Sequence, residues 1–140
     1  MPPLRILIVD DHVDTRALLS RLLRIDGHTV LTASTAGEAI AVATDNPFDL
    51  LLSDLSLPDR SGLELMREIR QLCGNVRGIA LTGMEAPEYK KACEEAGFAG
   101  FLRKPLDLTS LLAEIESVRR DRNVPPSTRA EGANDRASID

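Results

Sequence analysis

Five side chains suited to catalysis stand at the ends of short aliphatic stretches of the chain. Three are acids, one is a hydroxyl and one is an amine: Asp10, Asp11, Asp54, Thr82 and Lys104. Two carboxylates about 4 Å apart repel by about 4 kcal/mol at an effective dielectric near 20, and one lysine cannot offset three of them. A divalent cation can, and an all-oxygen donor set favours Mg²⁺, which keeps several waters. The pattern predicts a weak magnesium site with positions open to phosphate oxygens.

These side chains meet only if the stretches before them are strands of one sheet. The hydrophobic period alternates five times between a short aliphatic run and a helical repeat. The expected strands are 6–9, 28–33, 48–53, 78–81 and 100–103. A helix is expected after each of them, over 13–26, from 35 to 46, from 61 to 73, from 87 to 97, and from 107 to 118.

Local signals mark the ends of these helices. Thr35 to Glu38 and Ser61 to Glu64 both have the spacing of a capping box. Pro87 suits the first turn of a helix, Asp107 suits a cap, and Gly27 and Gly97 suit helix C-termini. The leucine spacing predicts that one face of the first and of the last helix points inward, with Leu18, Leu19, Leu22, Leu23, Leu108, Leu111, Leu112, Ile115 and Val118.

Five strands, each followed by a helix, predict an α/β fold with parallel strands and right-handed crossovers. We expect a five-stranded parallel sheet in the order 2-1-3-4-5, in a doubly wound three-layer sandwich. In that order the chain reverses direction between strands 1 and 3, and ligands bind outside the carboxyl ends of strands at such a point. The five side chains should therefore gather there.

Composition excludes several classes of protein. The chain has 140 residues, a net charge of −5 and 3% aromatic residues, which argues against a nucleic-acid binder that needs basic and aromatic surfaces. Cys73 and Cys93 lie far apart and form no metal or disulfide pattern. The first apolar run is too short for a signal peptide or membrane span, so we expect a cytoplasmic protein without membrane contact. Residues 1–120 should form one domain and 121–140 a disordered tail or linker.

At four places the chain resembles the receiver domains of response regulators in two-component signalling, which have a flavodoxin-like fold. The matching motifs are Ile8-Val9-Asp10-Asp11, Ser53-Asp54-Leu55-Ser56-Leu57-Pro58-Asp59-Arg60-Ser61-Gly62, Ala80-Leu81-Thr82-Gly83 and Gly100-Phe101-Leu102-Arg103-Lys104-Pro105. Together they lie within residues 4–118. The expectations below follow from this resemblance.

The resemblance implies that Asp54 is the phosphoacceptor. It would take a phosphoryl group from a phosphohistidine on a histidine kinase or histidine phosphotransfer protein, in a Mg²⁺-dependent step. Asp11, Asp54 and the backbone carbonyl of Ser56 would hold the metal directly, and Asp10 would act mainly through a bound water. Lys104 would pair with one phosphoryl oxygen, while the Thr82 hydroxyl donates to another.

The resemblance also implies a switch. Thr82 would move toward the phosphoryl group, Phe101 would fill the space it leaves, and a cis peptide bond before Pro105 would aim Lys104 at the site. The surface of helix 4, strand 5 and helix 5 would then contact an unknown downstream protein, or a second copy in a phosphorylation-dependent homodimer. Ser56 and Met84 flank the acceptor and would influence the lifetime of the phosphoryl group.

Other assignments were weighed against the same residues. His12 and His28 resemble no ligand pair, and His12 suits a surface position at a helix start. An aspartyl-nucleophile phosphatase of the haloacid dehalogenase type normally has a second Asp where this chain has Ser56, so no multiple-turnover enzyme is expected. The acids after the first strand would repel the phosphate of FMN, and the chain has no P-loop. The intact set of acceptor, acids and lysine argues against a degenerate receiver that serves only for protein contacts. A stand-alone regulator, which we favour, and a receiver separated from a hybrid histidine kinase or other larger chain stay open.

Overall fold

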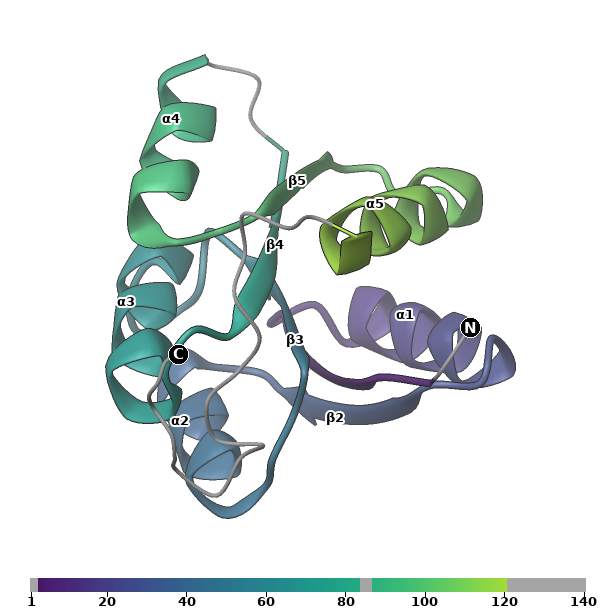
Figure 1. Ribbon diagram of the computed structural model, residues 1–140, viewed down its shortest axis with the longest axis horizontal. Coiled ribbons are helices and arrows are strands. Elements are labelled where there is room, and N and C mark those ends of the chain that lie inside the picture. Colours follow the sequence, from purple (N-terminus) through teal and green to yellow (C-terminus); the bar gives the residue numbers. More distant parts are fainter. Residues whose placement is uncertain (1–2, 84–86, 121–140) are drawn as a thin grey trace.

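The computed structural model describes residues 3–83 and 87–120, and these form a sheet between two layers of helices (Figure 1). The strands are β1 (Arg5–Val9), β2 (Thr29–Ala33), β3 (Leu50–Asp54), β4 (Arg77–Thr82) and β5 (Gly100–Arg103). The helices are α1 (Val13–Ile25), α2 (Ala36–Asp45), α3 (Gly62–Cys73), α4 (Pro87–Ala96) and α5 (Leu108–Arg120). Helices α1 and α5 cover one face of the sheet, and α2, α3 and α4 cover the other (Figure 1).

The sheet is parallel throughout and has the order β2-β1-β3-β4-β5, which confirms the predicted fold class. The central strand β3 is buried over its whole length, as expected for a parallel strand covered on both faces. Because β1 pairs with both β2 and β3, the crossover direction reverses beside β1. The carboxyl ends of β1 and β3 therefore open the crevice that the sequence predicts.

Alternation along the strands divides the core in two. Leu7 and Leu51 point toward α2 and α3, while Ile8 and Leu52 point toward α1 and α5. Successive strand residues face opposite sides, so each strand supplies both clusters. This two-sided burial fixes the strand positions and with them the residues at the strand ends.

Two of the predicted helix faces are wrong in one residue each. Leu18 of α1 is 54% exposed and Leu108 of α5 is 42% exposed, whereas Leu19 and Leu23 are buried. Both exposed leucines lie at the edge of the apolar stripe, and the helix rotation that buries Leu19 and Leu23 turns Leu18 outward. Leu111, Ile115 and Val118 face inward, as predicted.

The helix ends follow their local signals with one correction. Ser61 and Glu64 form the predicted capping box at the start of α3. At α2 the Thr35 side chain accepts from the Glu38 N–H, but the Glu38 carboxylate accepts from the N–H and hydroxyl of Ser34. The capping box predicted at Thr35 is therefore only half formed. Gly27 and Gly97 have φ angles of 98° and 113°, where glycine is favoured.

Both thiols are buried, and neither forms a disulfide bond. Burial, and then the charge of Glu94, raise the pKa of Cys93 to about 11, so this thiol is not a nucleophile at neutral pH. Within residues 3–83 and 87–120, no helix has the length and apolarity that a membrane crossing requires. The predictions for Met84 and for the 121–140 tail fall outside the described residues.

Candidate functional site

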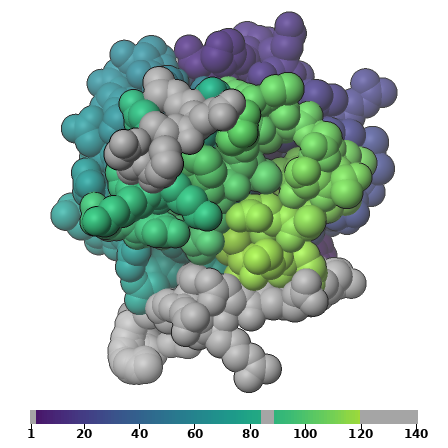
Figure 2. All heavy atoms as spheres, turned by 90° about the horizontal axis from the view of Figure 1, so that it is seen from above, coloured from purple at the N-terminus to yellow at the C-terminus, as the bar shows by residue number. Residues whose placement is uncertain are grey.

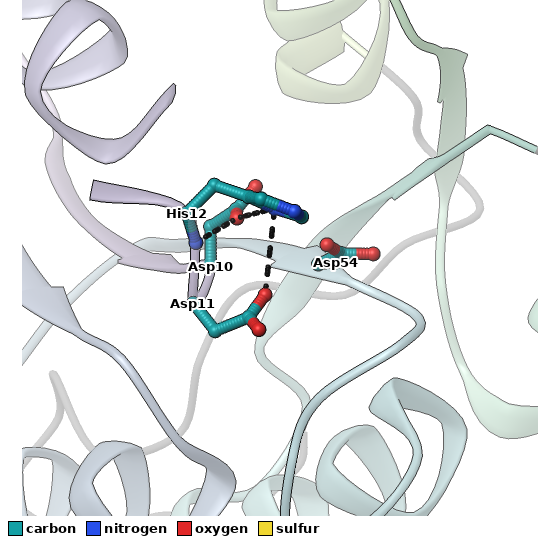
Figure 3. A group of neighbouring side chains, drawn as sticks. All are labelled: Asp10, Asp11, His12 and Asp54. Atoms are coloured by element: carbon teal, nitrogen blue, oxygen red, sulfur yellow. Dashed lines mark hydrogen bonds and ion pairs between the residues drawn. The ribbon is translucent and has the colours of Figure 1, made fainter. Parts of the chain in front are cut away.

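The carboxyl edge of the sheet brings together side chains that are far apart in sequence. Asp10 directly follows β1, Asp54 and Thr82 are the last residues of β3 and β4, and Lys104 directly follows β5. The register places Asp54 opposite Leu81 and Thr82 opposite Arg103, so these strand ends lie level. Figure 3 shows the carboxylates of Asp10, Asp11 and Asp54 near one another at this edge.

Lys104 connects the two buried acids. Its Nζ donates to Asp10 Oδ2 at 2.9 Å and to Asp54 Oδ2 at 3.0 Å. Asp10 is fully buried and Asp54 is 5% exposed. Burial lowers the pKa of Lys104, but the hydrogen bonds to Asp10 and Asp54 together with the negative charges of these acids leave that pKa above its ordinary value. The amine is therefore charged at neutral pH.

The second oxygen of each buried acid has its own donor. Asp10 Oδ1 accepts from the backbone N–H of His12 at 2.8 Å, and Asp54 Oδ1 accepts from the N–H of Ser56 at 3.0 Å. The ring Nδ1 of His12 lies 3.0 Å from Asp10 Oδ1 and 3.4 Å from Asp11 Oδ1 (Figure 3). Each carboxylate is thus held in one orientation before any ligand arrives.

The four side chains at this edge could hold a metal ion. Asp10, Asp11, His12 and Asp54 each offer a ligand atom, and these atoms lie within 4.8 Å of one another. Three carboxylates face a single ammonium, so a cation would relieve the excess negative charge. The Asp11 side chain is 40% exposed, which leaves the group accessible from solvent. The oxygen-rich donor set fits the predicted Mg²⁺.

His12 is the site residue that sequence reasoning missed. Its side chain is 65% exposed, as predicted for a helix start, and it is also the residue before α1. The ring nevertheless turns toward Asp10 and Asp11 (Figure 3). Its position immediately after the acid pair was the only signal that could have indicated this contact.

Glycine allows α3 to begin directly behind Asp54. A Cβ on Gly62 would lie 2.3 Å from the Asp54 carbonyl oxygen, so no other residue fits without moving the backbone. The Gly62 N–H donates to the Leu55 carbonyl at 2.8 Å, and Ser56 and Ser61 form an isolated antiparallel bridge. The segment 55–61 is therefore a loop closed at its base next to Asp54.

Other backbone contacts fix the walls of the site. Arg16 Nη1 donates to the Asp10 carbonyl at 2.7 Å, and the Lys104 N–H donates to the Thr82 carbonyl at 2.7 Å. The bond between Lys104 and Pro105 is cis, as predicted. Phe101 is half-buried against the α2–α3–α4 side of the core.

The predicted residues therefore differ in how far the geometry supports them. Lys104 lies at bonding distance from Asp10 and Asp54, and a carboxylate oxygen of Asp11 lies within 4.8 Å of ligand oxygens of both acids. Thr82 is 3% exposed at the end of the neighbouring strand. Ser56 contacts Asp54 through its N–H, while metal binding by its carbonyl stays a prediction.

Comparison with known proteins gives matches over most of the chain. The response regulator receiver domain family matches residues 6–116. The sensor histidine kinase RcsC of Escherichia coli is 35% identical over 122 residues, which cover 84% of this chain and 13% of RcsC. The chain spans less than a fifth of the length of RcsC and of the sensory/regulatory protein RpfC.

Solved structures agree with the sequence matches. The chemotaxis response regulator CheY4 of Vibrio cholerae is 30% identical, with a TM-score of 0.79 over 84% of this chain and 99% of CheY4. A response regulator of Burkholderia pseudomallei, solved with a phosphorylated aspartic acid, a calcium ion and citrate, is 26% identical, with a TM-score of 0.73 over 83% of this chain and 72% of that one. With its fold, its acid cluster and these matches, the chain belongs to the response regulator receiver domain family.

Proposed function

We propose that this receiver domain accepts a phosphoryl group on Asp54 from a phosphohistidine donor, in a step that requires Mg²⁺. The observation that carries the proposal is the bridging of two buried acids, Asp10 and Asp54, by Lys104 beside Asp11. The phosphorylated aspartic acid and calcium ion of the Burkholderia response regulator are consistent with this chemistry at a related site.

The nucleophile in this proposal is a carboxylate oxygen of Asp54. A bond forms between that oxygen and phosphorus while the bond from phosphorus to the donor imidazole nitrogen breaks. Asp11, Asp54 and the Ser56 carbonyl would hold Mg²⁺, with Asp10 linked through water, and the ion would neutralise charge on the transferring oxygens. The chain itself contributes alignment, because the Ser56 N–H and Lys104 already orient Asp54.

Lys104 and Thr82 would stabilise the phosphoryl group. The Lys104 amine, now shared by Asp10 and Asp54, lies 3.0 Å from Oδ2 of the acceptor carboxylate. A phosphoryl oxygen arriving there would accept a charge-assisted hydrogen bond from one of the three N–H groups of the Lys104 amine. The Thr82 hydroxyl would donate to a second phosphoryl oxygen.

We extend the proposal to a signalling surface. Helix α4, β5 and α5, in green to yellow, lie on one face of the molecule (Figure 2). Inward movement of Thr82 would open space for Phe101 and repack this face, which would then bind a downstream protein or a second copy. Structures with and without beryllofluoride test the switch, because an unchanged Phe101 rotamer would exclude it.

The donor is a histidine kinase or a histidine phosphotransfer protein. The similarity to part of the sensor histidine kinase RcsC favours a phosphorelay, either for a stand-alone regulator or for a receiver within a hybrid kinase. A cytoplasmic location fits the two cysteines, which form no disulfide bond. Sustained turnover is not part of the proposal, since Ser56 stands where a phosphatase of the haloacid dehalogenase type has its second acid; repeated hydrolysis of p-nitrophenyl phosphate would overturn this.

Intact-protein mass spectrometry tests the transfer itself. Wild-type protein and Asp54→Ala are incubated with acetyl phosphate, with and without Mg²⁺. The proposal predicts one added phosphoryl group on the wild type only when Mg²⁺ is present, and none on the variant. Phosphorylation of Asp54→Ala to the wild-type level would refute the assignment of the acceptor.

A further inference from the structure

The loop that follows the proposed phosphoacceptor is fastened at its tip to a different part of the chain. The Asp59 carboxylate accepts from the N–H of Ala36 at 2.9 Å and from the N–H of Gly37 at 2.8 Å. These are the first two residues of α2, whose N–H groups have no partner within the helix. Each carboxylate oxygen takes one donor, so Asp59 grips the helix start with both.

Space at α2 is matched to this contact. A Cβ on Gly37 would lie 3.3 Å from Asp59 Oδ2, tighter than an ordinary contact. The N–H groups of Ala36 and then Gly37 lower the pKa of Asp59 below its ordinary value, so the carboxylate is ionised at neutral pH. The positive end of the helix dipole favours the same charged state.

The start of α2 is in turn tied to the acid pocket. The Asp10 N–H donates to the carbonyl of Ala33, the last residue of β2, at 3.1 Å. Three residues later Ala36 donates to Asp59. The ends of β1 and β2, the start of α2 and the loop after β3 therefore form a closed ring around the site.

Within that ring, the loop has a fixed base and a tip held by side chains. Its base is closed by the Ser56–Ser61 bridge and by the Gly62 N–H bond to Leu55. At the tip, Arg60 forms an ion pair with Glu68 of α3, the helix that directly follows this loop in the chain. The two hydrogen bonds of the Asp59 side chain join the loop to the start of α2.

We propose that Asp59 is a positioning residue for the reaction at Asp54: its clamp on the start of α2 holds the 55–61 loop so that Ser56 stays in place beside the acceptor. The inference rests on the proposed function and deepens it. Ser56 contributes its N–H to Asp54 Oδ1 and, in that proposal, its carbonyl to Mg²⁺. Releasing the clamp frees the loop tip, and the Ser56–Ser61 bridge at the base of the loop would transmit that motion to the backbone of Ser56.

The chain offers a matched control for the variant Asp59→Ala. Thr35 caps the same helix by accepting from the Glu38 N–H at 3.0 Å, but it lies on the α2 side and does not hold the loop. Thr35→Ala should therefore weaken the start of α2 without releasing the 55–61 segment. Asp59→Asn keeps one acceptor oxygen and should restore part of the function.

Three measurements on the full chain separate positioning from simple helix capping. The Mg²⁺ dissociation constant comes from calorimetry, the initial phosphorylation rate from acetyl phosphate, and amide exchange of Ser56 from NMR of the metal-free protein. Removing an outer support of a metal site typically costs about tenfold to a hundredfold. We expect Asp59→Ala to weaken Mg²⁺ binding and slow phosphorylation by about tenfold and to speed Ser56 exchange, with Thr35→Ala unchanged in all three.

Equal effects of Asp59→Ala and Thr35→Ala on Mg²⁺ binding and rate would overturn the inference and leave Asp59 as a helix cap. A failure of the proposed function looks different, because the wild type would then neither bind Mg²⁺ nor become phosphorylated. In that case Ser56 exchange still decides about the clamp. Faster exchange in Asp59→Ala alone supports it, and unchanged exchange refutes it.

Discussion

The two ends of the central strands handle their charged groups in opposite ways. At the amino end, Asp49 accepts from the Arg5 N–H at 2.8 Å, and His28 accepts from the Leu4 N–H and contacts Asp26. These three side chains are each paired with a backbone N–H or with another side chain. At the carboxyl end, three carboxylates gather around the amine of Lys104.

This difference separates stability from function. Hydrogen bonds such as that from Arg5 to Asp49 contribute to folding and need no ligand. Crowded like charges oppose folding, since each additional carboxylate repels the others. In the proposed function these three acids would serve to bind a cation, and the following substitutions test that interpretation in order of effect.

Replacement of the proposed nucleophile should have the largest effect. Asp54→Asn removes the attacking oxygen and should reduce phosphorylation by acetyl phosphate to background, as seen by mass spectrometry. It also removes one of the repelling charges while the Ser56 N–H keeps an acceptor, so chemical denaturation should show no loss of unfolding free energy. A strongly destabilised Asp54→Asn would break the contrast between the two ends.

Removal of the ammonium group that bridges Asp10 and Asp54 should destabilise the carboxyl end of the sheet. Lys104→Met leaves the buried Asp10 and Asp54 carboxylates without their shared partner. Breaking such a buried pair costs about 3 kcal/mol in unfolding free energy, measurable by urea denaturation at pH 7. Added Mg²⁺ should recover part of this loss, and a variant as stable as the wild type would show that the acids do not need the amine.

At the amino end, Asp49→Ala should lower stability without affecting phosphorylation. Loss of the hydrogen bond from the Arg5 N–H should lower the unfolding free energy by about 1 kcal/mol. Phosphorylation should be unaffected, because the substitution lies at the opposite end of the sheet. A slower reaction in this variant would mean that the two ends are coupled.

Alkaline pH should reduce the difference in unfolding free energy between the wild type and Lys104→Met. Burial lowers the pKa of Lys104 in the folded state, but the hydrogen bonds to Asp10 and Asp54 and the charges of these acids together raise it above the ordinary value of 10.5. When the pKa of an amine is higher in the folded state than in the unfolded state, the charged amine stabilises the folded state. This stabilisation is complete at pH values below the unfolded-state pKa, and it is lost as the pH rises through the folded-state pKa. Denaturation curves above pH 10.5 should therefore converge, whereas a constant gap would exclude the charged amine as the cause.

Local sequence signals were sufficient for the fold and for most of the site. The alternation of strand and helix periods predicted five parallel strands, each followed by a helix, and reading the residue at each strand end gave Asp10, Asp54, Thr82 and Lys104. The order β2-β1-β3-β4-β5 was a separate expectation for this fold class, and the structure confirms it. Both signals depend only on neighbours along the chain. These predictions therefore need no information about tertiary contacts.

The rest depended on contacts that no local pattern records. Asp59 binds N–H groups 22 and 23 residues away, and nothing in its neighbourhood indicates that partner. The Glu38 carboxylate accepts from the N–H and hydroxyl of Ser34 and not from the N–H of Thr35, because the path of the preceding loop decides which donor is nearer. Leu18 was misplaced since leucine spacing defines a stripe, while packing on the sheet decides which edge of the stripe is covered.

Calorimetric titration with Mg²⁺ tests most directly the claim that the carboxyl-end acids are retained to bind a cation. Wild-type protein, Asp54→Asn and Asp49→Asn are titrated under identical conditions. We predict a single weak site in the wild type and in Asp49→Asn, and its loss in Asp54→Asn. Binding by Asp54→Asn as tight as by the wild type would contradict the account.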